Sequence, residues 1–309
     1  MSRLTELTAI SPVDGRYRAT TEPLADIVSE YGLMRWRVLM ECEYLVALAK
    51  EPSVPLKLSA GEVKQLRKWA ELKPREAETI KTIEKKGYRG TPATNHDVKA
   101  VEYWLRQKFA RTSLKDRAHW IHFGLTSEDV NSVAYALLVR EATGVVLAAV
   151  DNLIKQLDHL AKKHADLPML ARTHGQPASP TTFGKELRVF AERLTREQQL
   201  IAQSILHAKV SGATGNYNAH TIAFPKTNWP RFAKRFIEGF NSTSATIRLA
   251  VNRTTTQIEP HDSLAQHFQN LSRLNSICLD LSQDCWRYIS DSWLKQQTVK
   301  GEVGSSAMP

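Results

Sequence analysis

The sequence has little cysteine and no long hydrophobic run. Its cysteines, Cys42, Cys278 and Cys285, are odd in number and match no disulfide or metal framework, so we expect reduced thiols in a cytoplasmic protein. No stretch of about 18 consecutive apolar residues occurs, so no membrane partner is expected. The N-terminal stretch MSRLTELTAISPVDGRYR has no apolar signal core, and no secretion signal is expected.

Several motifs of enzyme chemistry are also missing. There is no HExxH, no Gly-x-Ser-x-Gly, and no glycine-rich phosphate loop after a strand pattern. His96 beside Asp97, and His119 with His122, have no further ligands at a useful spacing. We therefore expect no metal site, and the α/β-hydrolase class is excluded.

The charge balance is basic, with 42 Lys and Arg against 32 Asp and Glu and a net charge of +10. Such a balance allows an anionic partner, either nucleic acid or a phosphorylated metabolite. The basic residues are interspersed with acidic ones, as in KELRVFAERLTRE, and no zinc-finger spacing, aromatic-basic RNA motif or basic tail occurs. We expect a solvated basic surface and no nucleic-acid partner.

What the sequence does contain is helical periodicity. Apolar spacing predicts helices over 24–50, 60–73, 75–86 and 96–110, with Asn95 as the cap of the last one. The TSED motif begins a helix at Thr126, and no proline follows until Pro168, which allows roughly 60 Å of helix. Further long helices are expected from Ser179-Pro180 to about Val210 and from after Glu259-Pro260 to about Gln297.

These patterns predict an all-α fold with two domains. Residues 1–115 form an N-terminal helical domain, and residues 116–309 form an incomplete long-helix bundle without convincing strands. Between Val130 and Val150 the only charged residues are Arg140 and Glu141, so this stretch must be covered on several faces.

Unusual polar clusters lie between the long helices, at 171–180, 211–220 and 254–262, where bundle connections can converge on a ligand. In the first cluster, the glycine and proline that follow His174 force a defined turn and present the imidazole from a loop. Histidine titrates near neutral pH and suits a general acid or base. Many loop histidines are nevertheless plain surface residues, and both interpretations stay open.

Two further positions have alternative interpretations. Ser305 and Ser306 follow Gly304 and suit either a nucleophile, base or anion ligand, or a flexible linker. Arg16 and Tyr17 lie in a turn-rich segment, where arginine offers a fork for phosphate or carboxylate but is also common as a surface residue.

Together these stretches resemble the fumarase/aspartase superfamily, and within it the adenylosuccinate lyase family of bacterial purine biosynthesis. The resemblance is carried in order by SPVDGRY, TNHDVKAVEY, HFGLTSEDVN, RTHGQPASPTTFGKE, GNYNAH, TTQIEPHD and GEVGSSAMP. GSSAMP resembles the start of the superfamily's signature loop. We therefore expect a truncated chain that lacks the family's C-terminal domain. The link between Phe240 and Thr254 is longer than the family's.

The resemblance implies β-elimination of fumarate from adenylosuccinate, giving AMP, and from the succinyl-aminoimidazole-carboxamide ribotide, giving AICAR. It implies Ser305 as the base, His174 as the acid, and no cofactor. The substrate is an anionic nucleotide, and Lys185 is a weaker candidate to bind it. The implied binding residues are Arg16, Tyr17, Asn95, His96, Asp97, Thr126, Ser127, Gln257 and Ser306.

The resemblance also implies a homotetramer with active sites shared between subunits. Two alternatives remain at this point. The first alternative is another fumarate-releasing lyase of the superfamily, and the second is a non-catalytic, truncated subunit.

Overall fold

The computed structural model describes residues 5–242, 247–297, 299–301 and 304. The chain forms two compact units. The first comprises residues 1–149 and 202–267, and the second comprises residues 150–201 and 268–309. The domain boundary predicted between residues 115 and 116 stays a prediction.

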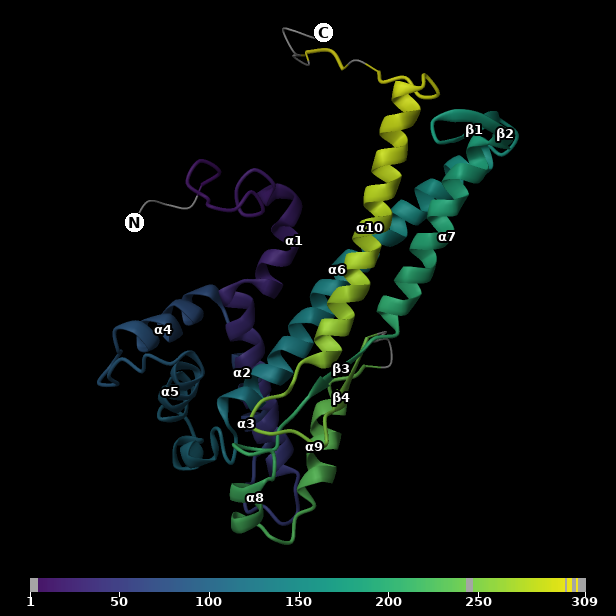
Figure 1. Ribbon diagram of the computed structural model, residues 1–309. Coiled ribbons are helices and arrows are strands. Elements are labelled where there is room, and N and C mark those ends of the chain that lie inside the picture. The colour runs from purple at the N-terminus through teal and green to yellow at the C-terminus, as the bar shows by residue number, and fades with distance from the viewer. Residues whose placement is uncertain (1–4, 243–246, 298, 302–303, 305–309) are drawn as a thin grey trace. The chain divides into compact units, whose positions relative to one another are not determined.

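The first unit contains most of the helices, whose order is labelled in Figure 1. Its elements are α1 (Arg18–Val28), α2 (Glu30–Ala49), α3 (Ala60–Ala70), α4 (Pro74–Lys85), α5 (Asp97–Phe109), the 3-10 helix η1 (Lys115–Trp120), β3 (Ile205–Ala208), α8 (Asn218–Ala223), α9 (Trp229–Glu238) and β4 (Arg248–Val251). The beginnings of α6 (Ser127–Lys163) and α10 (Asp262–Ser290) also belong to it. Strands β3 and β4 pair in parallel.

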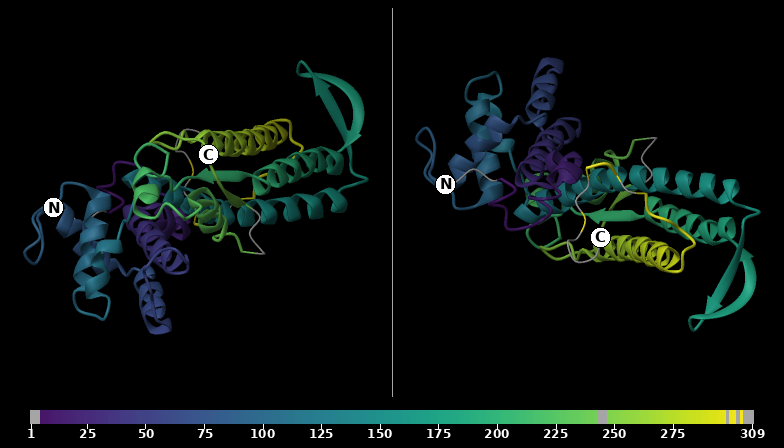
Figure 2. Two further views of the ribbon diagram at one scale, coloured as in Figure 1. Left: turned by 90° about the horizontal axis from the view of Figure 1, so that it is seen from below. Right: turned by 90° about the horizontal axis from the view of Figure 1, so that it is seen from above.

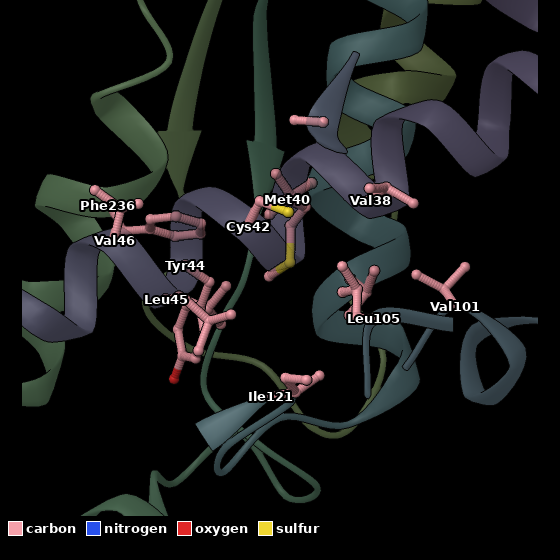
Figure 3. Packing of buried hydrophobic residues seen from close by; sticks show 14 of the residues in the cluster. Val38, Met40, Cys42, Tyr44, Leu45, Val46, Val101, Leu105, Ile121 and Phe236 are labelled. Carbon is pink, nitrogen blue, oxygen red and sulfur yellow. The ribbon is translucent and has the colours of Figure 1, made fainter. Parts of the chain in front are cut away.

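Helix α2 is the central helix of this unit, because eleven of its 20 residues are buried and it packs against α1, α3, α4 and α5. Figure 3 shows its side chains among residues of other segments. The labelled residues are Val38, Met40, Cys42, Tyr44, Leu45, Val46, Val101, Leu105, Ile121 and Phe236. Each fully buried aliphatic side chain stabilises such a core by about 1.5–3 kcal/mol. The core therefore fixes the helices that position the site described below.

The second unit is built from the rest of α6, the rest of α10, α7 (Phe183–Ala202) and the hairpin of β1 (Pro168–Thr173) and β2 (Gln176–Thr182). Its helical segments lie side by side (Figure 2). Leu187, Phe190 and Leu194 of α7 are buried in this unit. Ion pairs such as Arg193–Asp280, at 2.7 Å, lie at its exposed rim and add little stability.

The all-α fold class is confirmed, although four short strands occur among the described residues. The expectation of no strands was wrong. Only Met169 is buried among the residues of β1 and β2, so no buried face imposes the alternation that marks a strand in a sequence. Strands β3 and β4 are four residues each, too short for periodicity to reveal.

Helix boundaries differ from the predictions where local caps decide them. The helix predicted over 24–50 is two helices, because Ser29 is extended and its Oγ accepts a hydrogen bond from the Gly32 amide. The cap of α5 is His96 and not Asn95: the His96 Nδ1 accepts from the Lys99 amide, while Asn95 has a left-handed φ of 48°. The helix predicted from Ser179 is α7, which begins at Phe183 because β2 precedes it.

The TSED prediction is confirmed, since α6 begins at Ser127 and continues for 37 residues. By length and composition alone this helix could cross a membrane. Its apolar residues before Arg140 belong to the core of the first unit, with Val130, Val133 and Leu137 at most 1% exposed. A core helix of this kind has the same composition as a membrane span.

Candidate functional site

The turn that leads into α6 is the centre of the candidate site. Thr126 donates its amide to Asp129 Oδ2 at 2.8 Å, and the Asp129 amide donates back to the Thr126 carbonyl at 3.0 Å. This reciprocal cap fixes the start of the helix. Thr126 and Ser127 remain partly exposed, with their side chains available to a ligand.

A buried ion pair ties this turn to the loop 211–220. Lys209 Nζ lies 2.5 Å from Asp129 Oδ1, and both side chains are completely buried. Asp129 also accepts from the amides of Ser211, at 3.0 Å, and Gly212, at 3.0 Å. Because the lysine and two amides surround one carboxylate, the charge is fully compensated. The polar loop 211–220 is thus held next to the turn at Thr126 through Asp129.

His96 faces the same turn from the start of α5. Since its Nδ1 accepts from the Lys99 amide, the neutral ring carries its proton on Nε2, which lies 3.3 Å from Ser127 Oγ. A cavity of about 250 Å³ opens here. Its lining residues are His96, Val98, Lys99, Glu102, His122, Leu125, Thr126 and Ser127.

Gln257 reaches the turn from the third polar cluster. Its Nε2 lies 3.3 Å from Thr126 Oγ1, although the two residues are 131 positions apart. Behind it, Glu259 is buried and accepts from the Asn252 amide group at 2.8 Å and from the His261 backbone amide at 2.6 Å. These contacts position the segment that carries Gln257.

His261 lies between two carboxylates of this segment and of α6. Its Nε2 is 3.1 Å from Glu128 Oε1, and its Nδ1 is 3.3 Å from Glu259 Oε2. Burial raises the pKa of Glu128, against the opposing effect of His261. The arrangement joins the first turn of α6 to the loop of Gln257.

Asp97 is held by a buried arginine that the sequence analysis did not single out. Arg37 Nη2 lies 2.8 Å from Asp97 Oδ2, and Arg37 Nε donates to Asn131 Oδ1 at 2.9 Å. Burial raises the pKa of Asp97, but Arg37 and the Val98 amide outweigh it, and the net pKa is lowered. Arg37 thereby connects α2, α5 and α6 around the cavity.

His122 lines the same cavity and is paired with the buried Glu41. Its Nδ1 lies 2.5 Å from Glu41 Oε1, and its amide donates to Glu41 Oε2 at 3.2 Å. Burial lowers the pKa of His122, but the charge of Glu41 raises it further, so the net pKa is raised. No group of three or more His, Cys, Asp or Glu side chains that could hold a metal ion occurs among the residues that the structure describes.

The arrangement is suited to an anion. The groups around the cavity are mainly donors: the hydroxyls of Thr126 and Ser127, the His96 ring N–H and the Lys99 ammonium. The one carboxylate of the lining, Glu102, is neutralised by Lys99 at 2.7 Å and Arg106 at 2.8 Å. A carboxylate or phosphate at the start of α6 would also interact favourably with the helix dipole.

The structure brings together four of the predicted residues, His96, Thr126, Ser127 and Gln257, with Asp97 adjacent in the chain. Arg16 and Tyr17 do not line the cavity; they are exposed before α1, with the guanidinium 6.0 Å from the Tyr17 ring centroid.

The remaining predicted residues lie elsewhere. His174 belongs to the second unit, at the tip of the β1–β2 hairpin, where it and Gly175 have φ of 51° and 75° and form the two-residue turn. Lys185 lies at the start of α7 and contacts Glu186 at 2.9 Å. Ser305 and Ser306 lie outside the described residues.

We did not predict from the sequence the residues that support the site, chiefly Arg37, Glu41, Lys209 and His261. The motifs HFGLTSEDVN and TTQIEPHD contain several of the supporting polar residues: Asp129, Asn131, Glu259 and His261. Their place inside these motifs was a signal that could have identified them. The partners Arg37, Glu41 and Lys209 lie outside every motif that was recognised, so the sequence held no signal for them.

Comparisons with known proteins give the following matches. A family model described as "Lyase" matches residues 15–309. The adenylosuccinate lyase of Legionella pneumophila (strain Corby) is 43% identical over 99% of this chain, and that of Escherichia coli (strain K12) is 41% identical over 99%. The chain spans 65% of the length of these relatives.

Among solved structures, a fumarate lyase from Mesorhizobium sp. BNC1 has a TM-score of 0.66 at 17% identity, covering 87% of this chain and 57% of that one. The β-carboxy-cis,cis-muconate cycloisomerase from Acinetobacter calcoaceticus sp. ADP1 has a TM-score of 0.64 at 19% identity, covering 87% of this chain and 57% of that one. At this identity the two structures bear on the fold alone.

Proposed function

The chain belongs to the lyase family whose model matches residues 15–309, and on that premise we propose that it cleaves adenylosuccinate by β-elimination. The observation that carries the proposal is the convergence of His96, Thr126, Ser127 and Gln257 on one donor-rich site. These residues come from three separate stretches of the chain. Relatives named adenylosuccinate lyase, at 39–43% identity, favour this substrate.

In the proposed reaction a base removes a proton from the carbon beside a succinyl carboxylate, and an acid protonates the departing nitrogen. Fumarate and AMP are released. The same chemistry releases AICAR from the succinyl-aminoimidazole-carboxamide ribotide. We assign the base to Ser305 and the acid to His174. The carbanionic intermediate carries extra negative charge on its carboxylate, so preorganised donors must stabilise it.

We assign binding of a succinyl carboxylate to Thr126 and Ser127, because their hydroxyls stand at the start of α6. Gln257, 3.3 Å from Thr126 Oγ1, extends the same donor group. His96 and Asp97 belong to the nucleotide side of the pocket, with Asn95. Arg16, Tyr17 and Ser306 complete the proposed set, and no cofactor takes part.

The proposed enzyme is a homotetramer in which neighbouring subunits complete each active site. The uncharged stretch of α6 between residues 142 and 150 supports this, since Val145, Val146 and Leu147 are only partly buried within the chain. We also propose a cytoplasmic location, because Cys42, Cys278 and Cys285 are free thiols. The alternatives are a non-catalytic subunit and another fumarate-releasing lyase.

The test is incubation of the protein with adenylosuccinate and chromatographic measurement of fumarate and AMP. Stoichiometric release of both products is expected. In the active enzyme His174→Ala should lower turnover about 100-fold or more, as loss of a general acid does. Arg16→Ala should mainly raise KM. A panel with argininosuccinate, malate and aspartate distinguishes another lyase of the superfamily.

Binding measurements separate the non-catalytic alternative. Ser127→Ala should weaken binding of adenylosuccinate, whereas Lys64→Ala, which removes an exposed lysine of α3, should not. Saturable binding without product release would favour the non-catalytic subunit. Equal affinities of both variants and the wild type would contradict the proposed site.

A further inference from the structure

A second cavity of about 330 Å³ lies in the first unit, between the start of α9, the end of β4 and the loop before α8. It shares no lining residue with the cavity at Ser127. Its volume is at the lower end of small-molecule sites, which span about 300–1,000 Å³. Its lining residues are Tyr217, Pro230, Arg231, Lys234, Val251 and Arg253.

Three cations and no carboxylate line this cavity. Arg231 and Lys234 are three positions apart on α9 and therefore share a face of the helix. Arg253 follows β4, which packs against α9 (Figure 1). Positive charges gathered in this way repel one another, and an anion between them would remove the repulsion.

The cations have little compensation from the protein itself. Lys234 Nζ lies 3.9 Å from Glu238, the longest ion pair in the described part of the chain. Arg231 and Arg253 form no ion pair with any residue in that part. Most other arginines here do have an acidic partner, as Arg235 has in Glu51 and Arg67 in Glu43. The side chains of Arg231 and Arg253 are therefore free to bind an external anion, and Lys234 is paired only at long distance.

The opposite wall of the cavity is rigid. Tyr217 is 9% exposed, has a left-handed φ of 56°, donates its amide to the Ser211 carbonyl at 2.8 Å and packs edge-on against His220. Burial and the nearby Asp129 raise the pKa of Tyr217 to about 12, so its phenol adds no negative charge. Val251 and Pro230 add apolar surface suited to the body of a small organic molecule.

We propose that this cavity binds a small phosphorylated molecule, with the phosphate held by Arg231, Lys234 and Arg253. The planar guanidinium fork matches phosphate oxygens in pairs, and an ammonium adds a further point charge. The site is separate from the proposed substrate site and does not depend on lyase activity. Its test is therefore independent of the test of the proposed function.

The experiment is isothermal titration of the 309-residue protein with inorganic pyrophosphate at low ionic strength. Saturable binding is expected, and the double variant Arg231→Ala/Arg253→Ala should raise Kd at least about 10-fold. Lys64→Ala removes an exposed lysine elsewhere and should change Kd by less than about 2-fold. His96→Ala, in the other cavity, should leave this binding in place.

Two single variants keep the test valid if the double variant fails to fold. Lys234→Gln removes one exposed charge and should also weaken pyrophosphate binding, while Arg253→Lys keeps the charge and should retain most of it. No saturable binding by the wild type would overturn the proposal. So would equal weakening by Lys64→Ala, or loss of the binding in His96→Ala, since the anion would then sit elsewhere.

Discussion

Lys209 Nζ lies 2.5 Å from Asp129 Oδ1, and neither side chain has any exposed surface. The pair connects Lys209, which directly follows β3, to the first turn of α6. Since Asp129 also accepts the amides of Ser211 and Gly212, its partners fix the loop 211–220 as well as the helix. The donor-rich turn at Thr126 depends on this pair for its shape.

Replacing Lys209 should therefore be costly. Lys209→Met leaves Asp129 buried without its counter-charge, and removal of one partner of such a pair typically costs about 3–5 kcal/mol. The measurement is the free energy of unfolding in urea. As a control, Lys155→Met breaks the exposed pair with Asp151 and should cost less than about 1 kcal/mol. Similar costs for the two variants would show that burial does not decide the effect.

His220 should make stability depend on pH on the acidic side. Burial, with the charge of Lys209, lowers its pKa to about 4 from 6.5. The folded state therefore keeps the ring neutral while the unfolded state takes up a proton below pH 6.5, so stability is present above pH 6.5 and is lost as pH falls towards 4. The loss should reach about 3 kcal/mol, at about 1.4 kcal/mol per pH unit.

The matched variant is His220→Gln, whose amide can replace the Nε2 contact with the Tyr44 hydroxyl, at 2.9 Å in the wild type. Urea midpoints of both proteins between pH 7 and pH 4 give the difference. The wild type should lose more stability than the variant across this range. Parallel curves would mean that His220 titrates normally in the folded protein.

His122 should behave in the opposite direction. Burial alone would lower its pKa, but Glu41 at 2.5 Å raises it overall. Its contribution to stability is present below pH 6.5 and is lost as pH rises through the folded pKa. NMR titration of the ring should give a pKa above 6.5 in the wild type. In Glu41→Gln burial should dominate, and the pKa should fall below 6.5; an unchanged value would contradict the role of Glu41.

The sequence predicted those parts of the site that depend on residues close together in the chain. The cap in TSED places Thr126 and Ser127 at the start of α6, and the two residues after Thr173 form a tight turn at His174. Partners distant in the chain were not predictable from one sequence. Arg37 and Asn131 are 94 positions apart, and Glu41 and His122 are 81 apart, with no local pattern linking them. Helix ends were misplaced where exposed strands or a histidine cap, as at His96, decided them.

Gly124 should tolerate no side chain, because the turn before Thr126 packs directly against His220. Its φ is 70°, and an added Cβ would lie 2.6 Å from the His220 ring. That ring cannot move aside readily, since it contacts Trp229 at 4.8 Å and Phe123 at 5.7 Å between ring centroids. Gly124→Ala combines left-handed strain with overpacking and should cost about 2–4 kcal/mol.

Gly90 provides the matched control for this prediction, because it has a similar φ of 80° but open space around the added Cβ. Gly90→Ala should cost only the backbone strain, about 1 kcal/mol. The free energies of unfolding of both variants give the comparison. Gly124→Ala should also weaken ligand binding at the Ser127 cavity, since Leu125 and Thr126 follow directly in the same turn. If both variants lose the same stability, the contact between Gly124 and His220 does not shape the site.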